Sequence, residues 1–146
     1  ESLPWIYLQD TSCVIEEFKV IGSPWQPTFY NWAFNLDEKE LTHKWRAIPS
    51  DTDILLLHGP PHNYGDAITL RHTPKDRDDT KWPTPEHVGS RSLLTRILEV
   101  KPKLVVAGHI HSGYGIYNIG ETIFANASYV NEKYQETNNP IIIDLE

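Results

Sequence analysis

Two short apolar runs, each followed closely by a histidine, constrain the fold of this chain more than any other feature. Residues 53–58 and 104–107 are flanked by turn residues, which is typical of strands that are buried on both faces. Between them, residues 88–100 place their apolar side chains on one helical stripe and end before Lys101-Pro102. A strand, a helix and a second strand in this order predict a right-handed parallel crossover in an α/β sheet.

Local signals predict the other elements. A hairpin is expected from strands at 5–8 and 13–21, and a packed aromatic loop at 25–32. The apolar spacing and the acidic first turn of residues 36–48 predict a second helix. Further along the chain we expect a long polar loop or lid at 62–87, a hairpin at 114–119 and 122–125, and a closing strand at 141–143.

Composition limits the kind of protein. The 146 residues, 39% of them hydrophobic, fit one globular domain over 1–146. A net charge of −7, with no basic cluster beyond Lys75, Arg77 and Lys81, argues against binding to duplex nucleic acid. Cys13 is the only cysteine, so no internal disulfide forms and a reducing cytoplasm is expected. No apolar run approaches the roughly 20 residues of a membrane span.

The histidines stand where a site is expected. His58 follows the first apolar run, and His109 and His111 follow the second. Ligands bind at the carboxyl ends of the strands in open α/β sheets, so all three lie on the side where a site should form. Gly59 and Gly108 beside them allow close approach of the backbone to a ligand or ion.

Three separated stretches resemble the last motifs of the calcineurin-like metallophosphoesterase superfamily, in the family's order. They are Leu57-His58-Gly59-Pro60-Pro61, Ala107-Gly108-His109-Ile110-His111 and Asn126-Ala127-Ser128. Residues 21–27, 108–115 and 140–145 resemble more closely still the branch called metallophosphoesterase domain-containing proteins, across essentially the whole chain.

The resemblance implies an α/β fold, namely the C-terminal half of an αββα sandwich with a mixed β-sheet and flanking helices. It also implies two divalent metal ions, with His58 and His109 on one ion and His111 on the other. Metal pairs of this kind clamp a phosphoryl group and activate water. Mn²⁺, Fe or Zn²⁺ suit the mixed imidazole and carboxylate ligands.

The family's earlier motifs, Asp-x-His, Gly-Asp-x-x-Asp and Gly-Asn-His-Asp/Glu, do not occur in this chain. In the family they supply a bridging aspartate, an asparagine ligand and the histidine that protonates the leaving group. The catalytic residue is therefore unknown in this chain. The N-terminal half of the same protein becomes the expected partner, as in a cleaved or separately expressed domain.

Other residues near the motifs are candidates for substrate binding. His62, Asn63 and Tyr64 follow the first motif, where a solvated loop is the alternative, and Asn126 can instead satisfy a turn. The aromatic residues at 25, 29, 30 and 32 are expected in the core or on a docking surface, although a nucleotide substrate would make them stacking candidates. No role is assigned to the remaining histidines, His43, His72 and His87.

The sequence thus predicts a metal-dependent phosphodiesterase or phosphatase for small phosphate esters, and the resemblance suggests cyclic nucleotides as the substrate class. A second hypothesis is an inactive or regulatory fragment that works by association with another chain, because half a sandwich leaves sheet edges and apolar surface uncovered. A third arrangement, with three imidazoles on one Zn²⁺ in this chain alone, is open as well.

Overall fold

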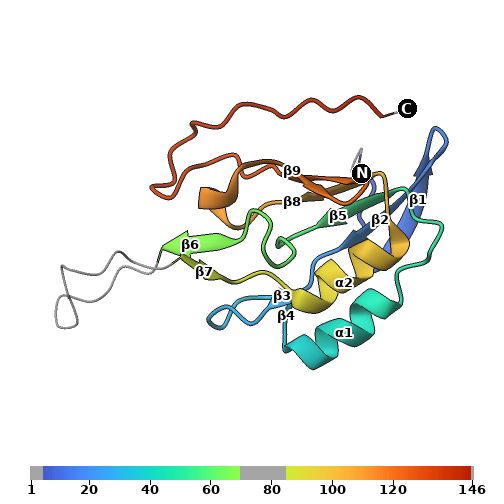
Figure 1. Cartoon of the computed structure of the whole chain (residues 1–146), viewed down its shortest axis with the longest axis horizontal. Coiled ribbons are helices and arrows are strands. Elements are labelled where there is room, and N and C mark those ends of the chain that lie inside the picture. The colour runs from blue at the N-terminus through green and yellow to red at the C-terminus, as the bar shows by residue number, and fades with distance from the viewer. Residues whose placement is uncertain (1–4, 70–84, 146) are drawn as a thin grey trace.

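A six-stranded sheet forms the centre of the molecule, with strand order β1-β2-β5-β8-β10-β9 (Figure 1). The computed structural model describes residues 5–69 and 85–145. The strands of the sheet are β1 (Thr11–Ile15), β2 (Phe18–Ser23), β5 (Ile54–Leu57), β8 (Leu104–Ala107), β9 (Gly115–Ile119) and β10 (Thr122–Asn126).

The smaller elements lie around this sheet. Two short ribbons pair β3 (Gln26–Pro27) with β4 (Asn35–Leu36) and β6 (Ala67–Thr69) with β7 (Pro85–His87). The helices are α1 (Glu38–Arg46), α2 (Arg91–Val100) and the 3₁₀ turn η1 (His111–Gly113). Neither α-helix of the described ranges has the length and hydropathy that a bilayer span requires.

The inner strands are parallel, and the edge strands are antiparallel to their neighbours. β2 pairs with β5, β5 with β8, and β8 with β10, all in parallel, whereas β1 and β9 complete hairpins at the two edges. The predicted mixed sheet, the parallel pairing across α2 and the hairpin of β9 and β10 are therefore confirmed. Parallel pairing brings the carboxyl ends of β5 and β8 to the same edge of the sheet.

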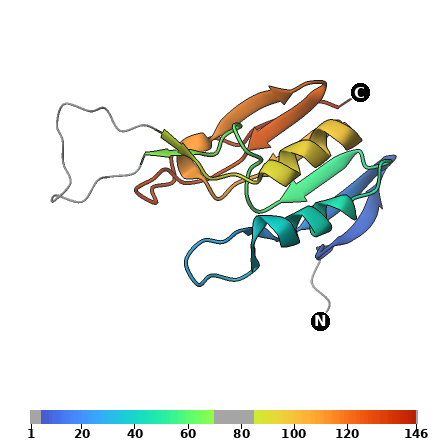
Figure 2. The same cartoon turned by 60° about the horizontal axis from the view of Figure 1, so that its bottom comes forward.

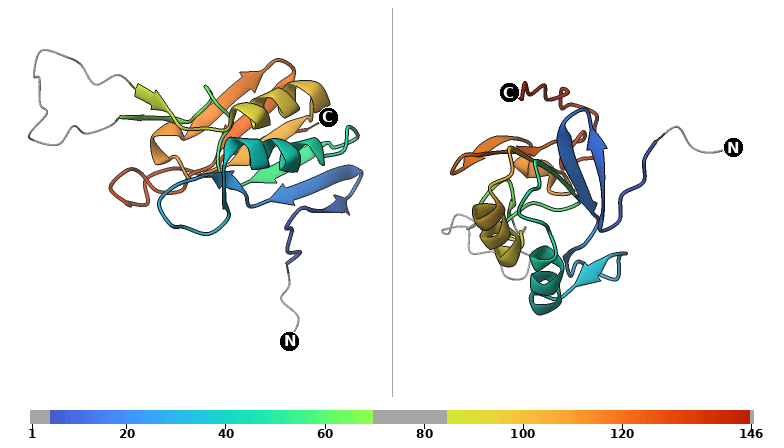
Figure 3. Two further views of the ribbon diagram at one scale, coloured as in Figure 1. Left: turned by 90° about the horizontal axis from the view of Figure 1, so that it is seen from below. Right: turned by 90° about the vertical axis from the view of Figure 1, so that its right-hand side faces the viewer.

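Both helices cover one face of the sheet, as the turned views make plain (Figures 2 and 3). One row of side chains across four strands faces the helices. In this row Ile21 lies beside Leu55, Leu55 beside Val105, and Val105 beside Phe124. All four side chains are buried in a single core cluster with apolar residues of α1 and α2. This packing fixes the orientation of the sheet relative to the helices.

The opposite face of the sheet is more open. Successive strand residues point to opposite faces, so Leu56 and Val106, which pair with one another, point away from the helices. Leu56 is 39% exposed although it lies in a central strand. The segment after β10 runs along this side of the sheet in Figures 1 and 3.

The N-terminal hairpin differs from its prediction. Residues 5–8 form no strand, and the hairpin is instead made by β1 and β2, with Glu16 and Glu17 as its turn. Glu16 has a left-handed backbone, with φ of 55°, which lets two residues reverse the chain. The two acidic residues that seemed only to interrupt a strand are therefore the turn itself.

The predicted closing strand is also wrong. Residues 141–143 form no strand, and Ile142 is 85% exposed. Both edges of the sheet are β1 and β9, and residues 141–143 pair with neither, so β-branched composition alone does not make a strand here. Of the predicted loop at 62–87, residues 70–84, which include His72, lie outside the described residues; its two ends form β6 and β7.

The helix predictions are confirmed, with shorter bounds. α1 begins after a capping box, in which the Asp37 carboxylate accepts from the Glu40 N–H at 2.8 Å and the Glu40 carboxylate accepts from the Asp37 N–H at 3.1 Å. α2 begins after Ser90, whose hydroxyl accepts from the Leu93 N–H at 3.2 Å. Each helix thus starts where a side chain satisfies its free N–H groups.

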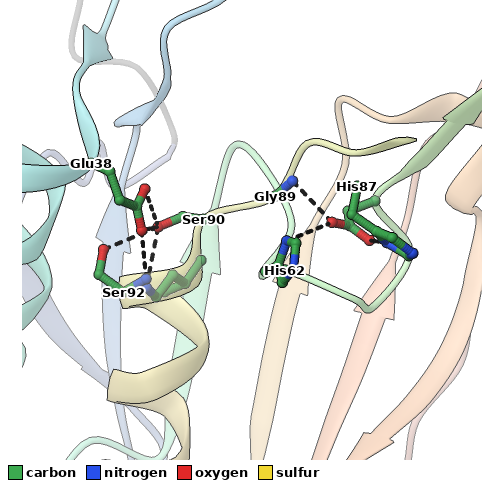
Figure 4. Close-up of polar contacts among 8 residues, drawn as sticks. Glu38, His62, His87, Gly89, Ser90 and Ser92 are labelled. Atoms are coloured by element: carbon green, nitrogen blue, oxygen red, sulfur yellow. Dashed lines mark hydrogen bonds and ion pairs between the residues drawn. The ribbon is translucent and has the colours of Figure 1, made fainter. Parts of the chain in front are cut away.

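Ser90 also joins the two helices (Figure 4). The residue is 1% exposed. Its hydroxyl accepts a hydrogen bond from the Trp45 indole at 3.1 Å and donates one to the Glu38 carboxylate at 3.1 Å. Glu38 accepts from the backbone N–H of Ser92 at 2.6 Å as well. One carboxylate therefore lies at the N-terminal ends of both helices, where negative charge is favourable.

We predict that Ser90→Ala lowers the free energy of unfolding by about 2–4 kcal/mol, because it removes a helix cap and the acceptor of a buried indole N–H. Urea unfolding followed by tryptophan fluorescence measures the loss. Thr95→Ala, at an exposed position of the same helix, is the control and should change stability by less than about 0.5 kcal/mol. Equal losses in both variants would contradict the assigned role of Ser90.

Candidate metal centre

His58 and His109 lie side by side at the tips of β5 and β8. The Gly108 N–H donates to the His58 carbonyl at 3.0 Å, so the two strand tips are tied together directly. The ring centroids of His58 and His109 are 4.6 Å apart, with the ring planes tilted by 39°. The close pairing that the sequence suggested for these two imidazoles is thus present in the structure.

His109 has an uncommon backbone conformation. Its φ is 67°, in the left-handed region that non-glycine residues seldom adopt. Strain of this kind persists only where the surrounding structure enforces it, and it concentrates at functional sites. Here it occurs at the residue whose ring packs against His58.

Both paired imidazoles favour the neutral state. Burial, the largest cause, and the positive charges that His58 and His111 can carry together lower the pKa of His109 to about 4. Burial of part of the ring also lowers the pKa of His58. The residue as a whole is exposed, and contact with water limits this effect. Neutral imidazole is the form that binds a metal ion, so the electrostatics of the pair suit ligation.

His111 is held apart from this pair by a tight turn. It opens η1, and its Nδ1 lies 3.0 Å from the carbonyl oxygen of Asn131. A carbonyl oxygen only accepts, so Nδ1 carries the proton and Nε2 is left with its lone pair. A backbone carbonyl that fixes the tautomer of a ligating histidine is a common outer-shell arrangement. The ring also packs edge-on against Tyr134, with centroids 5.1 Å apart.

All three histidines line one pocket of about 500 Å³. They do not converge on a single point, because no group of three histidine, cysteine or acidic side chains within residues 5–69 and 85–145 is arranged to hold one metal ion. The arrangement of three imidazoles on a single Zn²⁺ is therefore not supported. The pocket therefore holds the close pair of His58 and His109 rings and, separately, the ring of His111.

Asn126, a predicted substrate-binding residue, is fully buried and forms hydrogen bonds with residues of three loops. Its amide donates to the carbonyl oxygens of Ile110 at 2.9 Å and Gly65 at 3.0 Å. Its carbonyl oxygen accepts from the backbone N–H and the hydroxyl of Ser128, at 3.1 and 2.7 Å. Ile110 separates His109 from His111, so Asn126 positions the turn that carries both rings.

Close packing of glycines reinforces this arrangement. A Cβ added to Gly113, at the end of η1, would collide with the backbone of Gly65. Gly65 itself has φ of 59° and passes between Gly113 and the Asn126 side chain. The loop after β5 and the turn after β8 therefore interlock, and only glycine fits at their contact.

The other predicted substrate residues lie outside the pocket. Tyr64 packs against the core cluster, and Asn63 is exposed with φ of 70°. His62 is half-buried, and its Nδ1 faces Asp66 at 3.7 Å. Their role in binding a substrate is untested and stays a prediction.

A buried carboxylate that sequence reasoning missed, Asp66, lies next to the pocket wall, and Figure 4 labels its partners His87 and Gly89. Asp66 is 0% exposed and accepts from His87 Nδ1 at 2.7 Å and from the Gly89 N–H at 3.0 Å. Val88 and Gly89 line the pocket, so Asp66 anchors its wall from behind. No role is predicted for His87 from the sequence, and no local pattern marks a contact between the loop before β6 and the end of β7, 21 positions away.

Cavity size alone does not locate the site. A larger cavity of about 590 Å³ is lined by α1 and the β1–β2 hairpin, with the Asp10–Lys44 ion pair at its edge. None of the predicted site residues lines it. The histidine pocket is the smaller of the two, yet it contains the three histidines that are predicted from the sequence as metal ligands.

Comparison with known proteins identifies the family. The chain is 43% identical over 142 residues to the human and mouse proteins named metallophosphoesterase domain-containing protein 1, an alignment that covers 96% of this chain and 40% of each relative. A UPF0046 protein of Caenorhabditis elegans is 37% identical over 142 residues, covering 96% of this chain and 32% of that protein. The chain belongs to the metallophosphoesterase domain-containing proteins and corresponds to a C-terminal part of such a protein.

The chain spans about two fifths of the length of the first relatives it matches. One crystal structure aligns with 83% of this chain and 45% of its own, with a TM-score of 0.54 and 21% sequence identity, which supports the α/β fold. No family model matches the chain.

We predict that Asn126→Ala lowers the free energy of unfolding by about 2–4 kcal/mol, because two carbonyl oxygens and the Ser128 backbone N–H lose buried hydrogen bonds. The histidine ring signals of residues 109 and 111 should shift in NMR spectra of the variant. Asn118→Ala, at an exposed position of β9, is the control and should leave both properties unchanged. Unchanged stability and unchanged ring signals in Asn126→Ala would exclude the positioning role.

Proposed function

We propose that this chain forms part of a metal-dependent phosphodiesterase or phosphatase that hydrolyses small phosphate esters. The observation that carries the proposal is the His58–His109 pair, with ring centroids 4.6 Å apart and His111 in the same pocket. Cyclic nucleotides are the substrate class within this proposal, as the family resemblance suggests. A pocket of about 500 Å³ is of the size that small-molecule ligands occupy.

The residues present fit a divalent metal pair in their chemistry. His58 and His109 would hold one ion and His111 the other, with Mn²⁺, Fe or Zn²⁺ as suitable metals. Such a pair, when bound, polarises a phosphoryl group and activates water. The chain's own contribution is orientation, because Asn131 fixes the tautomer of His111 and Asn126 fixes the turn between the two rings.

The remaining ligands and the leaving-group acid are proposed to come from an N-terminal part of the same protein. Two observations support this division. No three histidine, cysteine or acidic side chains of the described residues are placed to hold one ion, and the sheet face opposite the helices is open, with Leu56 39% exposed. A second sheet packed against Leu56 and Val106 would remove this apolar surface from water.

A regulatory or inactive module is the alternative function. The same open face favours it, since a chain that binds a partner through Leu56 and Val106 needs no complete metal centre of its own. The two functions differ in one respect. Only the enzyme requires the histidine pair for turnover.

We expect His109→Ala to weaken Mn²⁺ binding and turnover by more than the roughly 10–100-fold that loss of an outer-shell partner costs. Calorimetric titration with Mn²⁺ measures the first. Hydrolysis of bis-p-nitrophenyl phosphate, in the presence of the N-terminal half, measures the second. His43→Ala, at an exposed histidine of α1, is the matched control and should behave as the wild type. Wild-type metal binding and turnover in His109→Ala would remove this residue from the site.

Mixing experiments test the division of the site. The chain alone, with Mn²⁺, should show no turnover of bis-p-nitrophenyl phosphate, whereas an added N-terminal half should restore it. Leu56→Asp should weaken association of the two parts in sedimentation velocity runs, because it places a charge on the apolar face. Leu98→Asp, at an exposed position of α2 on the other side, is the control. Full activity of the single chain would show that the site is complete without the second part.

A further inference from the structure

Aromatic side chains form walls of the histidine pocket. Phe29 and Trp32 come from the loop between β3 and β4, and Tyr134 comes from a turn after β10. All three line the same pocket as His109 and His111. Two segments that are far apart in the sequence thus bring aromatic rings to one cavity.

The loop that carries Phe29 and Trp32 is held in a fixed shape. The Asn35 side chain accepts from the Phe29 N–H at 3.2 Å and donates to the carbonyl oxygens of Phe29 and Tyr30, both at 3.1 Å. Phe29 packs edge-on against Trp32 and against His109, with centroids 5.2 Å apart in each case. The wall is therefore organised before any ligand arrives, which lowers the entropic cost of binding.

Much of the aromatic surface remains uncovered. The Trp32 ring packs against Phe29, and the Tyr134 ring packs against His111. Trp32 is nevertheless 55% exposed and Tyr134 74% exposed. Large aromatic groups in a rigid setting gain most from contact with another planar ring. Neither ring contributes to the core cluster.

The charge of the pocket disfavours a second anionic group on the ligand. Glu132 lines it from the same turn as Tyr134, and no lysine or arginine of the described residues does. A carboxylate beside a phosphoryl group that is already anionic disfavours further negative charge on the ligand. A sugar phosphate or polyphosphate with extra charged groups is therefore a poor match to these walls.

We propose that Phe29, Trp32 and Tyr134 form a subsite for an uncharged planar ring of the substrate, an aryl group or a nucleobase, next to the histidines. The inference rests on the proposed phosphoesterase function, which it deepens by naming the residues that select the ester group. The ring packs on Trp32 and Tyr134 and leaves the phosphoryl group at the histidines.

Ligand-observed NMR tests the subsite without hydrolysis. Saturation transfer from this chain should reach the ring protons of adenosine or of phenol and should be absent for ribose, which has no aromatic ring. The two aromatic probes separate a nucleobase subsite from an aryl subsite. Trp32→Ala and Tyr134→Ala should each abolish the transfer. Tyr30→Ala should not, because Tyr30 is 81% exposed on the same loop and does not line the pocket.

Hydrolysis provides the second readout. The complete protein, with metal and the N-terminal half, is assayed with p-nitrophenyl phenyl phosphate and p-nitrophenyl methyl phosphate, which share a leaving group. The wild type should show a KM about tenfold lower for the phenyl ester, the effect expected of one stacked ring. Trp32→Ala should reduce this ratio to about one. The KM for the methyl ester should change much less than the KM for the phenyl ester, because the methyl group has no ring to stack.

The outcomes separate the two proposals. No turnover of either ester by the complete wild-type protein would overturn the phosphoesterase function, while the NMR result would still decide the subsite. The subsite is overturned if no aromatic probe receives saturation, if ribose receives as much as adenosine, or if the transfer survives in either Trp32→Ala or Tyr134→Ala. Loss of transfer in Tyr30→Ala alone would also overturn it, because the probe would then bind outside the pocket.

Discussion

The parallel pairing of β5 and β8 is the constraint on which the rest of the structure depends. It sets Leu55 beside Val105 under the helices, and it continues past the strands, where the Gly108 N–H donates to the His58 carbonyl. Two histidines that are about fifty residues apart in the sequence are thereby brought into ring contact. Without this register the rings would leave the sheet at different levels, and no common pocket would form.

Much of this fold is predictable because its signals are local. The capping box joins Asp37 and Glu40, only three residues apart, and the apolar runs of β5 and β8 each consist of four consecutive residues. Strands depend on partners as well as on composition, and the two wrong predictions show this. Residues 5–8 and 141–143 have strand-like composition but pair with no strand in the described part of the chain. A run of β-branched and aromatic residues therefore predicts only the capacity to form a strand.

The site was predictable in part for the same reason. His58, His109 and His111 follow apolar runs, so their common edge follows from the strand order. The role of Asn126 does not follow from the strand order. Only the folded structure shows that its side-chain amide forms hydrogen bonds with Gly65, Ile110 and Ser128. The pairing of Asp66 with His87 likewise escapes prediction, because it depends on the ribbon of β6 and β7, whose three-residue strands are too short for a periodic signal.

The conformation of His109 argues that the pairing has a purpose beyond stability. A left-handed backbone at a residue with a Cβ costs free energy, and the His58 imidazole, with its ring centroid 4.6 Å away, disfavours protonation of the His109 ring. A glycine at this position would relieve the backbone strain, and a leucine would bury more apolar surface. Neither would offer a neutral nitrogen lone pair beside that of His58. The arrangement is costly for a structural residue and useful for a ligand, which is why the histidine pair, more than the fold, points to metal binding.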